Sequence, residues 1–146
     1  MKGYLLDTNL LIALLWPAHE WHDRAVKWFI HHRDKGWATC PFTEAGFVRI
    51  VSNPAFSRDA VQPCEAVQVL CANTAAKDHQ FWPDASPLAE TVAFAGGRLL
   101  GHQQVTDAYL LGLALRHGGR LATLDQRISA LADPKSAPRA ALEVVE

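Results

Sequence analysis

Short apolar runs that end in an acidic residue alternate along this chain with longer segments of helical periodicity. The first run, Gly3–Leu6, is followed by Asp7, and a similar run, Arg120–Leu124, is followed by Asp125. Strands that alternate with helices favour a parallel sheet covered on both faces. In such folds, ligands gather beyond the carboxyl ends of the strands. We therefore expect both aspartates to lie at a functional edge of the sheet.

The same patterns predict the order of the elements. The expected strands are Gly3–Leu6, Trp37–Cys40, Phe81–Trp82, Arg120–Leu124 and Leu142–Val145. The expected helices run from a cap at Thr8 or Asn9 to Leu15, from His19 to Asp34, from Thr43 to the Asn53-Pro54 stop, from Pro63 to Asn73, from Ser86 to Ala95 and from Val105 to His117. Gly96, Gly97 and Gly101 indicate a mobile loop.

Composition restricts the class of protein. The 146 residues are 49% hydrophobic and 20% charged, which is typical of one globular domain, 1–146, and excludes a disordered or collagen-like chain. The net charge of −1 provides no global positive field for a polyanion. The longest apolar run, Leu10–Trp16, is too short to cross a bilayer, and we expect a cytoplasmic protein without a membrane partner.

The three cysteines form no CxxC pair, and their odd number favours reduced thiols. Cys64 and Cys71 are seven residues apart, so they share one helix face. We expect that both pack in the interior.

Four acidic residues stand out by their context: Asp7, Glu44, Asp107 and Asp125. Each has an ordinary explanation, because acids in a first helical turn complement the helix dipole and an aspartate can cap a strand end. Four converging carboxylates, however, would repel one another unless cations bridged them. Such a set suits Mg²⁺ or Mn²⁺, which also bind phosphate. This donor set indicates phosphoester hydrolysis by a metal-activated water.

In their order and spacing these residues resemble a known family. Asp7-Thr8-Asn9 after the first strand, Glu44 near mid-chain, Thr106-Asp107-Ala108 at a helix start and Gly119–Asp125 are similar to the PIN-domain ribonucleases, and closest to the VapC-type toxins of toxin–antitoxin pairs. The segment Phe42–Pro54 also resembles one VapC subgroup. Ile128 departs from the pattern, since relatives often have an aromatic residue after the last acid.

The resemblance implies a three-layer α/β/α sandwich with a short, mainly parallel central sheet. It further implies a homodimeric endoribonuclease that cleaves single-stranded or loop RNA with Mg²⁺ or Mn²⁺ and is inhibited by a cognate, VapB-like antitoxin. By resemblance, the four acids bind the metal and are the catalytic groups. Three further residues would be supporting polar groups: Thr8, Asn9 and Thr106.

Several residues allow more than one reading. Four residues could contact RNA phosphate: Arg49, Arg98, His102 and Arg127. For each arginine taken alone, a solvated or salt-bridged surface position is the favoured interpretation, and His102 could equally be a surface histidine. His19-Glu20-Trp21-His22 lacks the spacing of a zincin motif and is interpreted as a solvent-facing helix start. Trp21 and Trp28 are expected in the core or a dimer interface. The exposed part of the Trp16–Trp28 region would accept an amphipathic antitoxin segment.

Two other functions remain open on the residues alone. The site could serve a metal-dependent phosphoesterase that acts on another nucleic acid, such as structured RNA or a DNA flap. The chain could also be a catalytically silent, partner-binding module, although the presence of all four acids argues against it.

Overall fold

The computed structural model describes residues 1–146 and has a five-stranded, fully parallel sheet at its centre. The strands are β1 (Tyr4–Leu6), β2 (Trp37–Thr39), β3 (His79–Phe81), β4 (Arg120–Thr123) and β5 (Leu142–Val144), in the spatial order β3-β2-β1-β4-β5. The earliest strand therefore lies in the middle, and the chain reverses its direction of winding between β3 and β4. Ligand sites of open parallel sheets form where the strand order reverses in this way.

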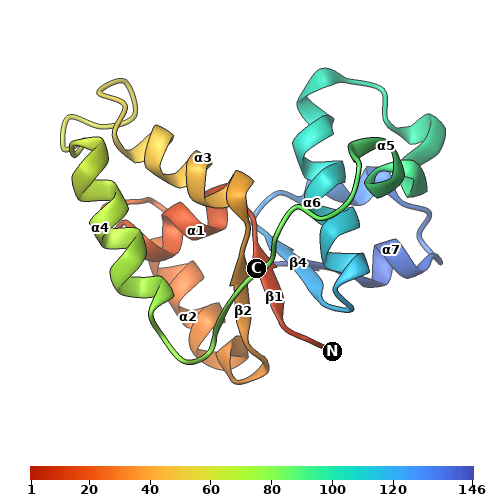
Figure 1. Ribbon diagram of the computed structural model, residues 1–146, viewed down its shortest axis with the longest axis horizontal. Coiled ribbons are helices and arrows are strands. Elements are labelled where there is room, and N and C mark those ends of the chain that lie inside the picture. Colours follow the sequence, from red (N-terminus) through yellow and green to blue (C-terminus); the bar gives the residue numbers. More distant parts are fainter.

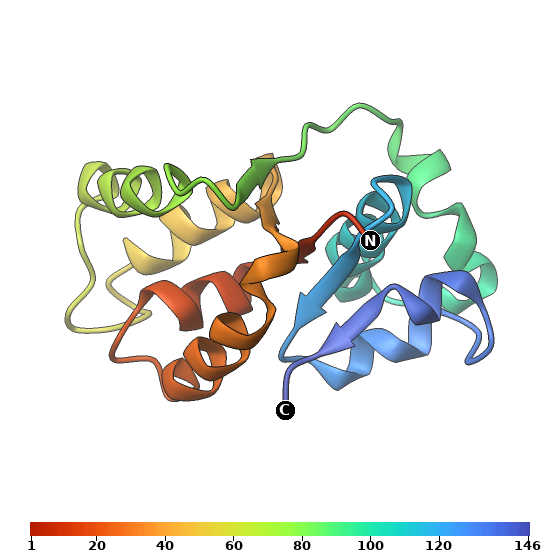
Figure 2. The same ribbon diagram turned by 90° about the horizontal axis from the view of Figure 1, so that it is seen from below.

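Helices cover both faces of the sheet and make three layers. On one face lie α1 (Thr8–Leu15), α2 (His22–His32), α3 (Pro41–Val51) and α4 (Pro63–Thr74). On the other lie α5 (Leu88–Thr91), α6 (Val105–Arg116), α7 (Ala137–Ala140) and the 3₁₀ turn Gln126–Leu131. Figures 1 and 2 show these two groups of helices on opposite sides of the strands. The structure confirms the predicted α/β/α sandwich.

Each face of the sheet has its own hydrophobic core. Alternate residues of β1 supply the two cores: Leu6 packs among the residues of α1 to α4, and Leu5 packs against α6. This alternation is the period of a strand whose two faces are both buried. The two cores fix β1 from both sides, and so they fix the position of Asp7 at its end.

A close approach of backbones in the α6 layer depends on a glycine. A Cβ atom added at Gly112 would lie 2.0 Å from the carbonyl oxygen of Thr91. Any larger residue would therefore force α5 away from α6. The absence of a side chain lets these two helices touch.

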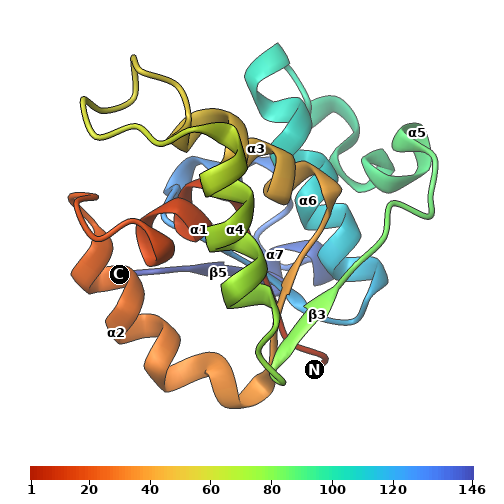
Figure 3. The same ribbon diagram turned by 60° about the vertical axis from the view of Figure 1, so that its left-hand side comes forward.

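Several predicted boundaries shift in the structure. Helix α2 begins at His22 rather than His19, because Trp16 to His22 form hydrogen-bonded turns first. Helix α3 begins at Pro41, two residues before the predicted start at Thr43, and β3 ends one residue before Trp82. The predicted Ser86–Ala95 helix is the single turn α5, which Figure 3 shows after the long connection from β3.

Three other expectations differ from the structure. The glycine-containing segment, predicted as a mobile loop, contains short 3₁₀ turns at Ala93–Arg98 and His102–Gln104. Cys64 and Cys71 do not pack in the core, since both lie on the outer face of α4 and only Cys40 is buried. Trp21 lies outside the core, with 40% of its surface exposed, so of its two expected places only a dimer interface remains, whereas Trp28 is buried.

Candidate active site at the carboxyl edge of the sheet

Asp7 is the most buried acidic residue of the site, with 5% of its surface exposed. It directly follows β1 and is itself the N-cap of α1, a position that was expected for Thr8 or Asn9. Its Oδ1 accepts a hydrogen bond from the Leu10 N–H at 2.8 Å, and its Oδ2 accepts one from the Thr123 hydroxyl. Both oxygens are therefore held at the start of the helix, where the helix dipole favours a negative charge.

Burial makes the charged form of Asp7 costly. Desolvation raises the pKa of the Asp7 carboxyl to about 6, against the lowering effect of its two hydrogen bonds. The negative charges of Asp107 and Asp125 contribute to this rise of the pKa. The structure thus brings three of the four predicted acids within electrostatic range of one another, from the ends of two neighbouring strands and the first turn of α6.

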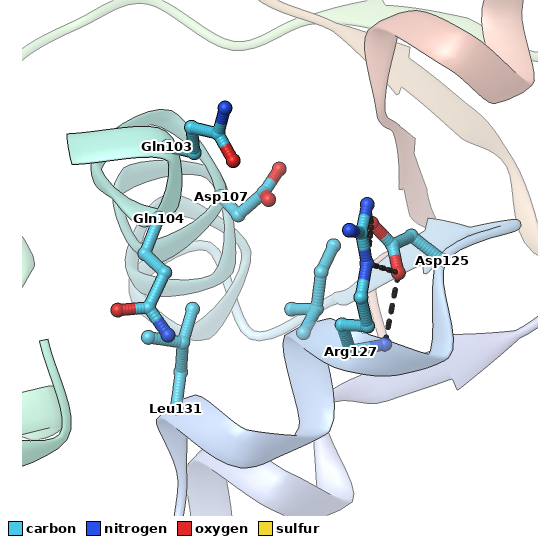
Figure 4. A pocket seen from close by; sticks show the side chains of 7 residues that line it. Gln103, Gln104, Asp107, Asp125, Arg127 and Leu131 are labelled. Carbon is cyan, nitrogen blue, oxygen red and sulfur yellow. Dashed lines mark hydrogen bonds and ion pairs between the residues drawn. The ribbon is translucent and has the colours of Figure 1, made fainter. Parts of the chain in front are cut away.

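Asp107 and Asp125 face one cavity of about 160 Å³, which is also lined by Gln103, Gln104, Arg127, Ile128 and Leu131. In Figure 4, Asp107 points from α6 toward Asp125 and Arg127 across this cavity. Desolvation and the charge of Asp125 raise the pKa of Asp107. The predicted edge of the sheet therefore carries a concave acidic surface.

Arg127 is the counter-ion of this surface. Its Nε and Nη2 donate to both carboxylate oxygens of Asp125, at 3.0, 3.2 and 2.8 Å, and its backbone N–H donates to Asp125 Oδ1 at 2.9 Å. These hydrogen bonds lower the pKa of Asp125. Arg127 is the only one of the four predicted phosphate contacts that lines the cavity; Arg49, Arg98 and His102 do not line it.

Glu44 lies on α3, which follows β2, and has a different partner. Its Oε2 accepts a hydrogen bond from the Thr39 hydroxyl at 3.0 Å, and Thr39 Oγ1 also lies 2.8 Å from His79 Nε2. The side chain is thus tied to the end of β2. No group of three or more aspartate, glutamate, histidine or cysteine side chains is arranged closely enough to hold a metal ion.

The predicted supporting residues occupy different environments. The Thr8 side chain packs against Gly46, where a Cβ would lie 2.8 Å from Thr8 Cγ2. Asn9 lines a second cavity that also borders Asp125 and Arg127. Thr106 is exposed on the first turn of α6.

The sequence reasoning missed Thr123, which is fully buried and bonded to Asp7. Its hydroxyl oxygen also accepts the Asp125 N–H at 2.9 Å, so it links two acids. The pairing of Leu6 with Ala122 places Thr123 beside Asp7. A signal was present, because Thr123 is a polar residue that directly follows the buried apolar pair Leu121-Ala122.

The fold and this acidic edge define the class of protein. The family model of the PIN domain matches residues 4–134. Over 97% of the chain, the structure is similar to the crystal structure of PAE2754 from Pyrobaculum aerophilum, with a TM-score of 0.61, 23% sequence identity and coverage of 83% of that chain. This likeness supports the fold.

Curated relatives make the assignment narrower. The chain is 48% identical to Ribonuclease VapC39 of Mycobacterium tuberculosis over 91% of its length and 94% of the relative. It is 41% identical to Ribonuclease VapC38 of the same species, with coverage of 97% of this chain and 96% of the relative. The chain therefore belongs to the VapC branch of the PIN-domain family. The structure contains no helix that is long and apolar enough to span a membrane.

Proposed function

We propose that this protein is an endoribonuclease toxin that cleaves single-stranded or loop RNA and is neutralised by a VapB-like antitoxin. The observation that carries the proposal is the gathering of Asp7, Asp107 and Asp125 from three separate elements at one edge of the sheet. The relatives named as ribonucleases cover almost the whole chain, which supports the same chemistry here. Residues 1–146 would act as one PIN-like domain, in the cytoplasm.

The chemistry of the carboxylates suits a hard divalent cation, and their side chains would have to move closer together to bind one, because no three of them are close enough in the structure. Asp7 carries an energetic cost of ionisation that rises with the charges of Asp107 and Asp125, and a cation between them would remove this cost. Mg²⁺ or Mn²⁺ would be held by Asp7, Asp107 and Asp125, with Glu44 as the proposed fourth ligand. When bound, such an ion supplies Lewis-acid activation of water and neutralises phosphate charge. Since Arg127 occupies both oxygens of Asp125, it would have to release them.

The residues of the chain itself then have definite tasks. The Leu10 N–H and the Thr123 hydroxyl orient the Asp7 carboxylate, and Thr123 also fixes the backbone at Asp125. The guanidinium of Arg127, once released, would bind the RNA phosphate through paired N–H donors. Asn9 and the exposed Thr106 would make polar contacts with the RNA strand, whereas Thr8 would have a packing role against Gly46.

The hydrolysis needs no protein nucleophile. The oxygen of a water molecule forms a bond to phosphorus, the bond from phosphorus to the 3′ oxygen breaks, and the 3′ oxygen takes up a proton. The products would carry a 5′-phosphate and a 3′-hydroxyl. The acidic residues would act through their negative charge, so a substitution that removes the charge and keeps the size of the side chain should lower the cleavage rate.

The test compares purified protein with Asp7→Asn and Asp125→Asn on single-stranded RNA, hairpin RNA and duplex DNA, with Mn²⁺ or with EDTA. Asp133→Asn is the matched control, because Asp133 is an exposed acid that pairs with Arg98 outside the cavity. We expect RNA cleavage with 5′-phosphate ends, lost in EDTA and lowered about 100-fold or more in both site variants. Cleavage of duplex DNA alone would favour the other phosphoesterase function. Unaltered cleavage by Asp7→Asn would refute the assigned role.

The partner is tested separately. Co-expression with the product of the neighbouring gene should give a complex that co-purifies and suppresses cleavage. The mass of the isolated protein in solution should be that of a homodimer. A stable, non-toxic monomer that retains no partner would contradict this part of the proposal.

A further inference from the structure

A second cavity adjoins the acidic one. It has a volume of about 370 Å³ and is lined by Asn9, His19, Glu20, Trp21, Leu124, Asp125 and Arg127. Asp125 and Arg127 also line the cavity that contains Asp107. Both hollows therefore border the Asp125–Arg127 ion pair, and the lining of the second reaches the residues just before α2. We refer to the two hollows together as the groove.

Trp21 is the aromatic residue of this groove. It is 40% exposed, whereas Trp28, Trp37 and Trp82 are buried. Its backbone N–H donates to His19 Nδ1 at 3.0 Å, and the guanidinium carbon of Arg24 lies 4.3 Å from the centre of its ring. The hydrogen bond holds the backbone of Trp21, the Arg24 guanidinium lies over its ring, and the residue lines the second cavity.

The lining of the groove indicates what kind of ligand it fits. Five of the seven residues around the second cavity are polar or charged, and only Leu124 and Trp21 are apolar. An amphipathic helix of a protein partner would need a more apolar surface. A nucleotide needs an aromatic face for its base, polar groups for its ribose and a guanidinium for its phosphate. Trp21, Asn9 and Arg127 provide these groups side by side.

We propose that Trp21 stacks on an unpaired base of the RNA strand whose phosphate lies at Asp125 and Arg127. This inference rests on the proposed ribonuclease function and adds a substrate-binding residue to it. Arg24 lies over one face of the ring and does not line the second cavity, and a cation on one face of an aromatic ring is compatible with stacking on the other. The contact would select single-stranded RNA, because a paired base is not free to leave its stack.

The test is a double-mutant cycle that combines a substitution in the protein with the removal of one base from the RNA substrate. Single-stranded RNA oligonucleotides with one mapped cleavage site are prepared with a single abasic residue at each position around it. Each is cleaved by the wild type, by Trp21→Ala and by Trp21→Phe, and kcat and KM are measured. Phe81→Ala is the matched control, because Phe81 is an aromatic residue with 53% exposure on β3, at the far edge of the sheet from β4.

We expect one abasic position to lower kcat/KM of the wild type about 10-fold, chiefly through KM, as expected for loss of one stacked base. Trp21→Ala should show the same loss on intact RNA and no further loss at that abasic position. Trp21→Phe should keep most of the activity and its dependence on the base, and Phe81→Ala should behave as the wild type. The melting temperature of each variant is measured; if Trp21→Ala fails to fold, Trp21→Phe and the abasic series decide.

Any of four results would overturn the inference. The first is that the losses from Trp21→Ala and from abasic substitution multiply independently at every position. The second is that Trp21→Ala and Trp21→Phe cleave as well as the wild type. The third is that Trp21→Ala changes the oligomeric state or the capture of a protein partner and leaves RNA cleavage intact, which would make this surface a protein interface. The fourth is that the wild type cleaves no RNA, which would also overturn the proposed function; the first three leave that function standing.

Discussion

Replacement of Asp7 by asparagine tests the electrostatics of the site without any assumption about the reaction. Asparagine has nearly the same shape, and its carbonyl oxygen can still accept the Leu10 N–H. Its amide can face the oxygen of Thr123, which already accepts the Asp125 N–H. The substitution therefore removes a buried negative charge at the cost of weakening one hydrogen bond.

The magnitude follows from the pKa of Asp7. Burial raises the pKa from its ordinary value of 3.8 to about 6, a difference that corresponds to about 3 kcal/mol in the free energy of unfolding. The folded state binds this proton more tightly than the unfolded state. The Asp7 carboxyl therefore does not lower the free energy of unfolding below about pH 4. The protein loses this stability as the pH rises through 6, and the loss is complete above that.

The assay is urea unfolding of both proteins at several pH values between 4 and 8, without divalent metal. Burial lowers the pKa of His79 and His117, so their stabilising effect has the opposite dependence on pH; the difference between the two proteins cancels these contributions. We expect Asp7→Asn to gain on the wild type as the pH rises, by up to about 3 kcal/mol at pH 8, reduced by the weakened bond to Thr123. A difference that stays constant from pH 4 to 8 would refute the reasoning.

Three further predictions follow from the site and the packing. Mn²⁺ at 100 times its dissociation constant should stabilise the wild type by about 2.7 kcal/mol in thermal unfolding, and EDTA should reverse this; an equal effect on Asp7→Asn would contradict the assigned ligand. Arg127→Gln should strengthen Mn²⁺ binding severalfold in calorimetry, because Asp125 then has no competing cation; unchanged affinity would show that the ion pair does not compete. Gly112→Ala should lower the free energy of unfolding by about 3 kcal/mol, because the new Cβ clashes with Thr91. Gly97→Ala is the control: no atom lies within 4 Å of its new Cβ, so its stability should stay within about 0.5 kcal/mol of the wild type.

Apolar runs and helical spacing in the sequence predicted the position of several strands and helices well. The run before Asp7 became β1, the run before Asp125 became β4, and the Pro63 helix became α4 with nearly the predicted bounds. The two strands before Asp7 and Asp125 lie in a sheet that is buried on both faces, so a short apolar run was enough to predict each of them. The placement of both aspartates at one edge followed from the parallel arrangement.

Periodicity failed where it had to decide which way a residue faces. Trp21, Cys64 and Cys71 have the spacing of core residues, yet all three lie at the surface. A helical period shows which residues share a face, and the neighbouring elements decide whether that face is covered. Trp21 lies just before α2 rather than inside it, so the helical spacing from which its burial was predicted does not apply to it.

The amino-acid sequence determined which four acids stand out, in what order strands and helices follow along the chain, and to which family the chain belongs. Each of these depends on residue type and spacing. The register of β4 against β1, which puts Thr123 on Asp7, was decided only by the tertiary structure. So were the pairing of Arg127 with Asp125, the separate bond of Glu44 to Thr39 and the exposure of Trp21. These features depend on distances between segments far apart in the chain or on which surfaces are left uncovered, and no local pattern of side chains encodes either.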